Sequence, residues 1–196
     1  MTIGLFIGRF QPFLHRRNEQ RRCSGGASPS SAPRTGLFIG RFQPFHKGHL
    51  SDIKESLKKV DELIIGIGSS QYSKTKDNPF SVEERIEMIE NSLVKEELSH
   101  YTIFPIPDIK DDKRWVKHVE KVAPKFDTIF TGNKLTEKLF KKAGYTVKKV
   151  EIIKGINGTT IRDKIIKDKP WKNLVPKETL EVIEKVNGLE RIKKPE

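Results

Sequence analysis

Two histidines separated by two residues are the most chemically suggestive feature of the sequence. His46 and His49 belong to the segment GRFQPFHKGHL, with Gly48 between them and Arg41 shortly before them. Imidazole N–H groups and a guanidinium are donors suited to phosphate oxygens. The spacing places both rings on one side of a helix start, where free backbone N–H groups also favour anions. The segment therefore predicts a phosphate-binding site.

A second segment, INGTTIR (156–162), has the composition of a phosphate-binding helix start. Gly158 and Thr159 can cap a helix and donate to a phosphate, and Arg162 follows nearly one turn later. Taken alone, the segment would be interpreted as an ordinary helix cap followed by a surface arginine. Together with the histidine pair it predicts a second contact to the same polyphosphate.

These two segments resemble the signatures of a known superfamily. HKGH after GRFQPF is similar to the HxGH motif of the nucleotidyltransferases, and INGTTIR is similar to their second motif. Within that superfamily, residues 36–196 most resemble the archaeal-type nicotinamide-nucleotide adenylyltransferases. The segments that carry this likeness are DELIIGIGSSQ (61–71), DNPFSVEER (77–85), PDIKDDKRWVKH (107–118), DTIFTGNKL (127–135) and NGLERIK (187–193).

The resemblance implies a reaction and a set of site residues. ATP and nicotinamide mononucleotide (NMN) would be the substrates, NAD+ and pyrophosphate the products, and Mg2+ the cofactor, bound mainly through the ATP phosphates. No side chain is assigned as a metal ligand. Trp115 would stack on the nicotinamide ring, and Asp108 would receive a ribose hydroxyl. The implied catalytic residues are His46, His49, Arg41 and Arg162; the ATP contacts are Gly40, Phe42, Gly48, Asn157, Gly158 and Thr159; the NMN contacts are Asp108, Trp115, Gly132 and Asn133.

The chain departs from the family pattern at two positions. Asn157 stands where the family often has serine, and Asp77 stands where some members carry an arginine, with Lys76 adjacent. Three alternatives stay open: another acceptor (nicotinate mononucleotide, pantetheine-phosphate, FMN or a cytidylyltransferase substrate), a basic nucleic-acid-binding module, and a catalytically dead homologue. The nucleic-acid interpretation is disfavoured because the lysines alternate with glutamates at helical spacing.

The elements that must position these residues alternate between strands and helices. Short apolar runs at 36–42, 62–68, 101–107, 127–132 and 146–153 predict strands, and periodic segments at 50–60, 81–93, 114–122, 135–144, 160–168 and 177–187 predict helices. This alternation predicts a Rossmann-like, doubly wound parallel α/β sheet with short C-terminal helices. In such sheets ligands bind beyond the carboxyl ends of the strands.

The N-terminal 34 residues repeat part of the domain that follows. GLFIGRFQPF occurs at 4–13 and again at 36–45, but the first copy continues into a Ser/Gly/Pro/Arg-rich stretch without the histidine motif. We therefore expect residues 1–34 to be a largely disordered extension, and residues 35–196 to form the nucleotidyltransferase domain. Whether the extension is native, an artefact or a functional basic arm stays open.

Composition restricts the remaining function classes. The formal net charge is +12, of which +5 belongs to residues 1–34. No apolar run approaches the roughly 18 residues of a membrane span, and the single cysteine, Cys23, excludes an internal disulfide. We expect a soluble cytoplasmic enzyme, and the family resemblance suggests a homo-oligomer.

Overall fold

The computed structural model describes residues 33–150, 153 and 155–194. The expectation for the N-terminal extension therefore lies, up to residue 32, outside the described residues. The described part of the chain belongs to one compact unit, Ala32–Glu196.

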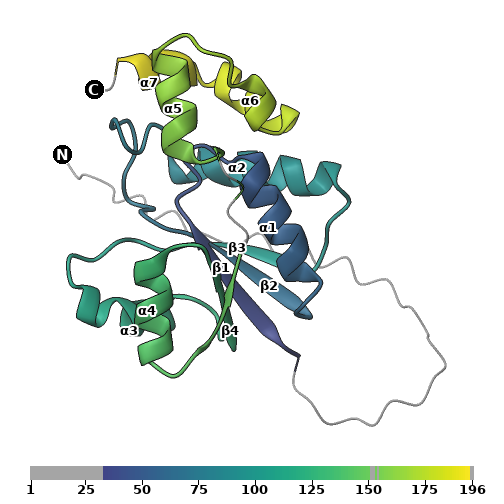
Figure 1. Cartoon of the computed structure of the whole chain (residues 1–196), viewed down its shortest axis with the longest axis vertical. Coiled ribbons are helices and arrows are strands. Elements are labelled where there is room, and N and C mark those ends of the chain that lie inside the picture. Colours follow the sequence, from purple (N-terminus) through teal and green to yellow (C-terminus); the bar gives the residue numbers. More distant parts are fainter. Residues whose placement is uncertain (1–32, 151–152, 154, 195–196) are drawn as a thin grey trace, which may run out of the picture. The chain divides into compact units, whose positions relative to one another are not determined.

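Five parallel strands form one sheet in the order β3-β2-β1-β4-β5 (Figure 1). Each coincides with one of the predicted apolar runs, and their ends lie within a few residues of the prediction. The strands are β1 (Thr35–Gly40), β2 (Glu62–Ile67), β3 (Tyr101–Pro105), β4 (Thr128–Thr131) and β5 (Thr146–Lys149).

The central strands are apolar on both sides because helices cover both faces of the sheet. Side chains alternate between the faces, so Phe38 and Ile65 lie in one core and Leu37 and Ile64 in the other. Helices α1 (Lys47–Leu57) and α2 (Val82–Lys95) cover the first face. Helices α3 (Asp112–Val122) and α4 (Lys134–Lys142) cover the second (Figure 1). The predicted doubly wound fold is confirmed.

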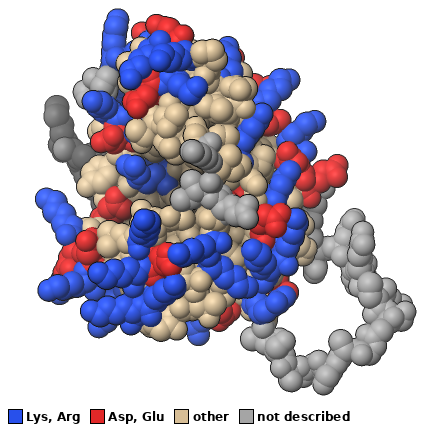
Figure 2. Space-filling view, viewed as in Figure 1, with Lys and Arg blue, Asp and Glu red and all other residues tan. Residues whose placement is uncertain are grey.

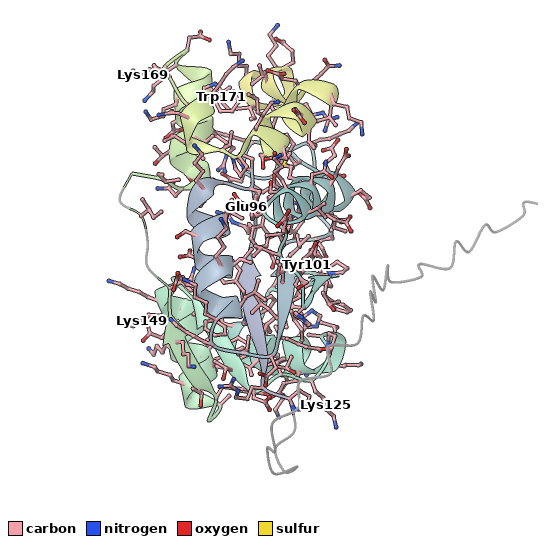
Figure 3. The ribbon with its side chains drawn as sticks, turned by 90° about the vertical axis from the view of Figure 1, so that its right-hand side faces the viewer. Glu96, Tyr101, Lys125, Lys149, Lys169 and Trp171 are labelled. Atoms are coloured by element: carbon pink, nitrogen blue, oxygen red, sulfur yellow. The ribbon has the colours of Figure 1, made fainter. Side chains whose placement is uncertain are left out.

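The C-terminal part differs from the prediction of two helices. Helix α5 (Gly158–Ile166) is followed by a short 3-10 helix, η1 (Lys172–Leu174), and by α6 (Lys177–Lys185) and α7 (Gly188–Lys193). The sequence pattern predicts a helix that ends just before Gly188, but this glycine begins α7. A Cβ there would lie 2.6 Å from the Phe80 ring, so close packing explains the glycine. Figure 3 shows Trp171 among these helices and Lys125 at the opposite end of the sheet.

The strand order creates a switch point between β1 and β4. The chain runs outward from β1 to β2 and β3, then returns to the other side of β1 to form β4 and β5. Connections leaving adjacent strands in opposite directions leave a crevice at their carboxyl ends, where α/β proteins bind ligands. Among the described helices, none has the length and apolar character that crossing a membrane requires.

Candidate active site

The histidine pair forms the N-terminus of α1, directly beyond β1. His46 is the N-cap: its backbone is extended, and its Nδ1 accepts a hydrogen bond of 3.2 Å from the backbone N–H of His49. This cap explains why α1 begins at Lys47, three residues before the predicted apolar pattern. Because an amide can only donate, Nδ1 of His46 carries no proton, and Nε2 is left as the donor.

The two imidazole rings stack on each other, with centroids 3.5 Å apart and planes 15° from parallel. The position of Gly48 allows this, because a Cβ there would lie 3.0 Å from the His46 ring. The Phe42 ring contacts the His49 ring edge-on, with ring centroids 4.7 Å apart. The Phe45 ring stacks on the His49 ring, with centroids 5.7 Å apart. The rings therefore stand on a rigid aromatic base.

Both histidines are neutral near physiological pH. Burial lowers the pKa of His46 to about 4, and burial together with the nearby His46 lowers the pKa of His49 well below its usual value. The pair therefore adds no positive charge to the site. The histidines are hydrogen-bond donors without charge, and the fixed charge comes from the arginines.

Arg162 joins α5 to the loop that follows β1. Its Nη1 donates to the main-chain oxygen of Gln43 at 2.8 Å, and only 6% of the residue is exposed. Gly158 packs against the same carbonyl, because a Cβ there would lie 2.8 Å from the Gln43 oxygen. Glycine at this position lets the N-terminus of α5 approach the histidine loop, so the two predicted motifs meet in space.

Two positively charged side chains, Arg41 and Arg162, lie close enough to repel each other. Burial lowers the pKa of Arg162, and the charge of Arg41 lowers it further. Arg41 itself is exposed. A guanidinium held near another guanidinium at the start of a helix favours an anionic ligand between them.

Asn157 and Asp77, the two departures from the family pattern, each accept a hydrogen bond from a residue of the INGTTIR segment. Asn157 is the N-cap of α5, its Oδ1 accepting from the Thr160 N–H at 2.8 Å. An amide thus replaces the serine cap without loss of the bond. The carboxylate of Asp77 lies 3.4 Å from Nη2 of Arg162 and is largely exposed. The Asp77 carboxylate thus accepts from Nη2 of Arg162, a donor that a bound phosphate would use. Thr159 is exposed in the first turn of α5.

Asp108 connects the loops that follow β2 and β3. Its carboxylate accepts from the Ser69 N–H at 3.2 Å and from the Ser69 hydroxyl at 2.5 Å. Gln71 and the main chain of Asp108 exchange two hydrogen bonds of 2.9 Å. A carboxylate has further acceptor positions, so this arrangement leaves capacity for a ligand hydroxyl.

Trp115 lies in the first turns of α3, partly buried against the second core. Its ring is 5.9 Å from that of His118. His118 Nε2 lies 2.8 Å from the carbonyl oxygen of Pro107, so this nitrogen carries the proton and donates. His118 therefore fastens α3 to the loop that holds Asp108.

Gly132 and Asn133 are exposed in the loop after β4. Asn133 caps α4, accepting from the Leu135 N–H at 2.8 Å and the Thr136 N–H at 3.1 Å. The side chain of Asn133 therefore already has hydrogen-bond partners within the protein.

Gly40 and Phe42 contact each other inside the protein. The sequence predicts Gly40 as a place where ligand approaches backbone, but a Cβ there would meet the Phe42 ring at 2.8 Å. Phe42 is 1% exposed, and its side chain supports His49 from below. Any contact of Phe42 with ATP would have to come from its main chain.

Two important residues are not identified by sequence reasoning. Gln43 is 3% exposed and exchanges two hydrogen bonds with the main chain of Phe80, at 2.8 and 3.0 Å. Arg85 is fully buried. The sequence holds a signal for it, because it occupies a position of the apolar stripe of α2 that continues with Met88 and Ile89.

Among the described residues, no cluster of three or more His, Cys, Asp or Glu side chains could hold a metal ion. A divalent cation fits this site only as a companion of the triphosphate, with phosphate oxygens and water as its main ligands.

Comparison with known proteins agrees with this geometry. The family model described as cytidylyltransferase-like matches residues 37–164. A nicotinamide-nucleotide adenylyltransferase of Pyrococcus furiosus is 44% identical over 198 residues, covering 98% of this chain and 88% of its own length. The enzymes of the same name from Methanococcus aeolicus and Thermoplasma acidophilum are 48% and 44% identical, each over 76% of this chain and 87% and 84% of their own lengths.

A solved structure is also similar. It is a bifunctional NMN adenylyltransferase/ADP ribose pyrophosphatase from Francisella tularensis, complexed with AMP and a manganese ion, with a TM-score of 0.68 and 26% identity. The likeness covers 83% of this chain and 52% of that one, so this chain spans about half the length of the bifunctional protein.

Proposed function

We propose that this chain, which belongs to the cytidylyltransferase-like family and within it to the nicotinamide-nucleotide adenylyltransferases, transfers the adenylyl group of ATP to NMN. The products are NAD+ and pyrophosphate. The observation that carries the proposal is the junction of the two motifs: the histidine pair at the start of α1 and Arg162 of α5 meet through the Gln43 loop.

The chemistry is an in-line displacement at phosphorus. An oxygen of the NMN 5′-phosphate forms a bond to the α-phosphorus of ATP. The bond between that phosphorus and the α–β bridging oxygen breaks, and pyrophosphate leaves with the electron pair. Charge develops on the leaving group, so donors aimed at the α- and β-phosphates stabilise the transition state.

His46 and His49 supply these donors. The Nε2–H of His46 is free to donate because Nδ1 is occupied by the helix cap. In the described structure Nδ1 of His49 is buried without a hydrogen-bond partner, so a phosphate oxygen at Nε2 would hold the His49 proton there. Both imidazole rings are neutral, so each donates a hydrogen bond to a phosphate oxygen and keeps its proton.

Arg41 and Arg162 hold the β- and γ-phosphates, assisted by the N-terminus of α5 at Gly158 and Thr159. At the other half of the site, Asp108 accepts a ribose hydroxyl of NMN, and Trp115 offers its face to the nicotinamide ring. Gly132 and Asn133 border the nucleotide beyond β4. Catalysis is then positioning combined with electrostatic stabilisation.

A divalent cation, which we infer to be Mg2+, would be held by the triphosphate and would neutralise part of its charge. The similar Francisella tularensis structure is a complex with AMP and a manganese ion, which supports a divalent cation in this class of enzyme. Because both substrates are water-soluble nucleotides, we infer that the enzyme acts in the cytoplasm. A homo-oligomer stays a prediction, which sedimentation of the purified chain would decide.

The acceptor is tested by measuring pyrophosphate release with ATP and Mg2+ across a panel of acceptors. The panel contains NMN, nicotinate mononucleotide, pantetheine-phosphate and FMN, with CTP replacing ATP in a parallel set. We expect ATP with NMN to give the highest kcat/KM. A higher value for pantetheine-phosphate, FMN or CTP would overturn the assignment of the acceptor or of the nucleotide.

A further inference from the structure

Arg85 is the largest fully buried side chain among the described residues, and its guanidinium donates to acceptors inside the protein. It lies in the first turns of α2. Its four hydrogen bonds all end on main-chain carbonyl oxygens: Nε donates to Ser81 at 3.0 Å, Nη1 to Arg41 at 3.0 Å and Gly68 at 2.9 Å, and Nη2 to Ser69 at 3.2 Å. Burial lowers the pKa of Arg85 to about 10, so it stays charged at neutral pH.

Three of these carbonyls belong to the turns that follow two neighbouring strands. Arg41 is the first residue after β1, and Gly68 and Ser69 are the first two after β2. Each turn contains a residue other than glycine in the left-handed region, Phe42 with φ 54° and Ser69 with φ 52°. Such conformations persist where the surroundings hold them in place. The Arg85 fork holds the carbonyl before each of them.

The two turns carry opposite halves of the site. The turn after β1 presents Arg41 and places the Phe42 ring against His49. The turn after β2 places Ser69, whose N–H and hydroxyl both bind the Asp108 carboxylate. Arg85 therefore joins the triphosphate half to the NMN half through its side chain, in addition to the backbone bond from the Gly68 N–H to the Gly40 carbonyl at 2.9 Å.

We propose that Arg85 is a positioning residue that fixes the distance between the triphosphate-binding turn and the turn that orients Asp108. By fixing this distance, Arg85 keeps the attacking phosphate of NMN in line with the α-phosphorus of ATP, an inference that rests on the proposed function. The bond to Ser81, the N-cap of α2, lies within the start of the helix itself, whereas the other three bonds are directed at the turns of the site. Removing Arg85 would take this donor from the carbonyls of Arg41 and Gly68, whereas the Ser69 carbonyl would keep the Tyr72 N–H at 3.2 Å.

The kinetic test compares Arg85→Lys and Arg85→Met with a control on the same helix pair. Lysine keeps the charge but donates from a single nitrogen, so it cannot reproduce the planar fork. The control is Arg191→Met, because Arg191 of α7 binds Glu84, the neighbour of Arg85, at 2.7 and 2.8 Å and has no bond to either turn among the described residues. Thermal melts first identify a temperature at which every variant is folded.

We expect kcat of Arg85→Lys to fall about 10- to 100-fold, the size expected for a misplacement near 1 Å. The KM values for ATP and NMN should each change less than about threefold, because each half-site keeps its own contacts. Arg191→Met should lose stability but keep kcat. A folded Arg85→Lys variant with wild-type kcat, or a kcat loss equal to that of Arg191→Met at equal stability, would overturn the proposal.

Amide hydrogen exchange separates this inference from the proposed reaction. In Arg85→Lys, amides at 41–43 and 68–70 should exchange faster, while the centres of β1 and β2 keep their protection. Arg191→Met should alter exchange only around α7 and α2. If the wild type makes no NAD+, the proposed function fails, and the exchange result still decides whether Arg85 holds the turns. Unchanged exchange at either turn overturns the inference.

Discussion

At the scale of single residues, the two histidines are stacked and neutral, with His46 buried and His49 partly buried. A charged imidazole would attract phosphate more strongly in the ground state, but two stacked rings 3.5 Å apart cannot both be charged at low cost. The fixed charge is left to Arg41 and Arg162, which flank the rings. The site therefore separates directional donation from charge neutralisation.

The buried, neutral state of His46 predicts an acid-sensitive fold. Its pKa is about 4 when folded and near 6.5 when unfolded, so the unfolded chain binds more protons between these values. Stability is complete above about pH 6.5 and falls as the pH decreases towards 4, by roughly 3 kcal/mol from this residue. His46→Asn keeps a cap for the His49 N–H but cannot titrate, so its loss of unfolding free energy between pH 7.5 and 4.5 should be about 2 kcal/mol smaller.

Urea unfolding at the two pH values measures this difference. His100→Asn, which changes an exposed histidine at a left-handed position, is the control and should retain the wild-type pH dependence. Equal pH dependence in the wild type and His46→Asn would show that His46 titrates normally in the folded protein.

Asp77 is predicted to compete with ATP for Arg162. The Asp77 carboxylate is 72% exposed and lies 3.4 Å from Nη2 of Arg162, whose Nη1 donates to the main-chain oxygen of Gln43. Although Arg162 is buried, water screens the exposed carboxylate, so the pair contributes at most about 1 kcal/mol, and Asp77→Asn should lower the KM for ATP about two- to fivefold with little change in stability. Steady-state kinetics measure it. Asp168→Asn, which removes a similarly exposed carboxylate from its pair with Lys193, should leave the KM unchanged. A higher KM in Asp77→Asn would mean that Asp77 orients Arg162.

At the scale of elements, the site depends on two helix N-termini meeting at one loop. The sequence is sufficient to predict the start of α2 because its cap is local: Ser81 with Glu84 forms the predicted capping box. Helices α1 and α5 are predicted as well, but they begin three and two residues before the predicted starts, at the His46 and Asn157 caps. The start of α7 at Gly188 could not be predicted, because that glycine packs against Phe80, a residue far away in the chain. The role of Arg85 escapes prediction for the same reason, since its four acceptors come from three separate segments.

Gly158→Ala tests the junction of α5 with the histidine loop. Alanine is a better helix former by up to about 1 kcal/mol, but its Cβ would lie 2.8 Å from the Gln43 oxygen. The helix must then move, and Arg162 with it, so kcat/KM for ATP should fall about tenfold or more.

The matched change is Gly144→Ala, at a glycine with φ 89° and no neighbour within 4 Å of an added Cβ in the described structure. It should lower stability by about 1 kcal/mol through backbone strain and leave kcat/KM unchanged. Comparable kcat/KM in the two variants would remove the requirement for close approach at Gly158.

At the scale of the whole molecule, the parallel sheet and its switch point bring together residues more than a hundred positions apart. Gly40 and Arg162 belong to one site because β1 is central and α5 returns to its carboxyl end. The alternation of apolar runs and helical segments is sufficient to predict the doubly wound parallel sheet, whereas the strand order comes from the structure. The net charge of +12 is less informative, since lysines and glutamates pair at helical spacing, as in Lys58–Glu55 and Lys141–Glu137. Figure 2 shows both charges mixed over the face in view.

A chain of residues 33–196 is predicted to keep full activity, because every assigned site residue lies between Gly40 and Arg162. Arg34 must be retained, since its carbonyl accepts from the N–H groups of Asp61 and Glu62. The kcat and both KM values should match those of the full chain at several salt concentrations. Lower activity in the folded shorter protein would assign a role to the basic N-terminal extension.

The most direct test of the central claim is the reaction itself, run with wild type and His49→Ala side by side. With ATP, NMN and Mg2+, the wild type should form NAD+ and pyrophosphate in equal amounts. His49→Ala should lower kcat about 100-fold or more while the KM for NMN changes little, because the donor acts in the transition state. Absence of NAD+ from the folded wild type, or a normal kcat with weakened NMN binding in His49→Ala, would contradict the proposed function.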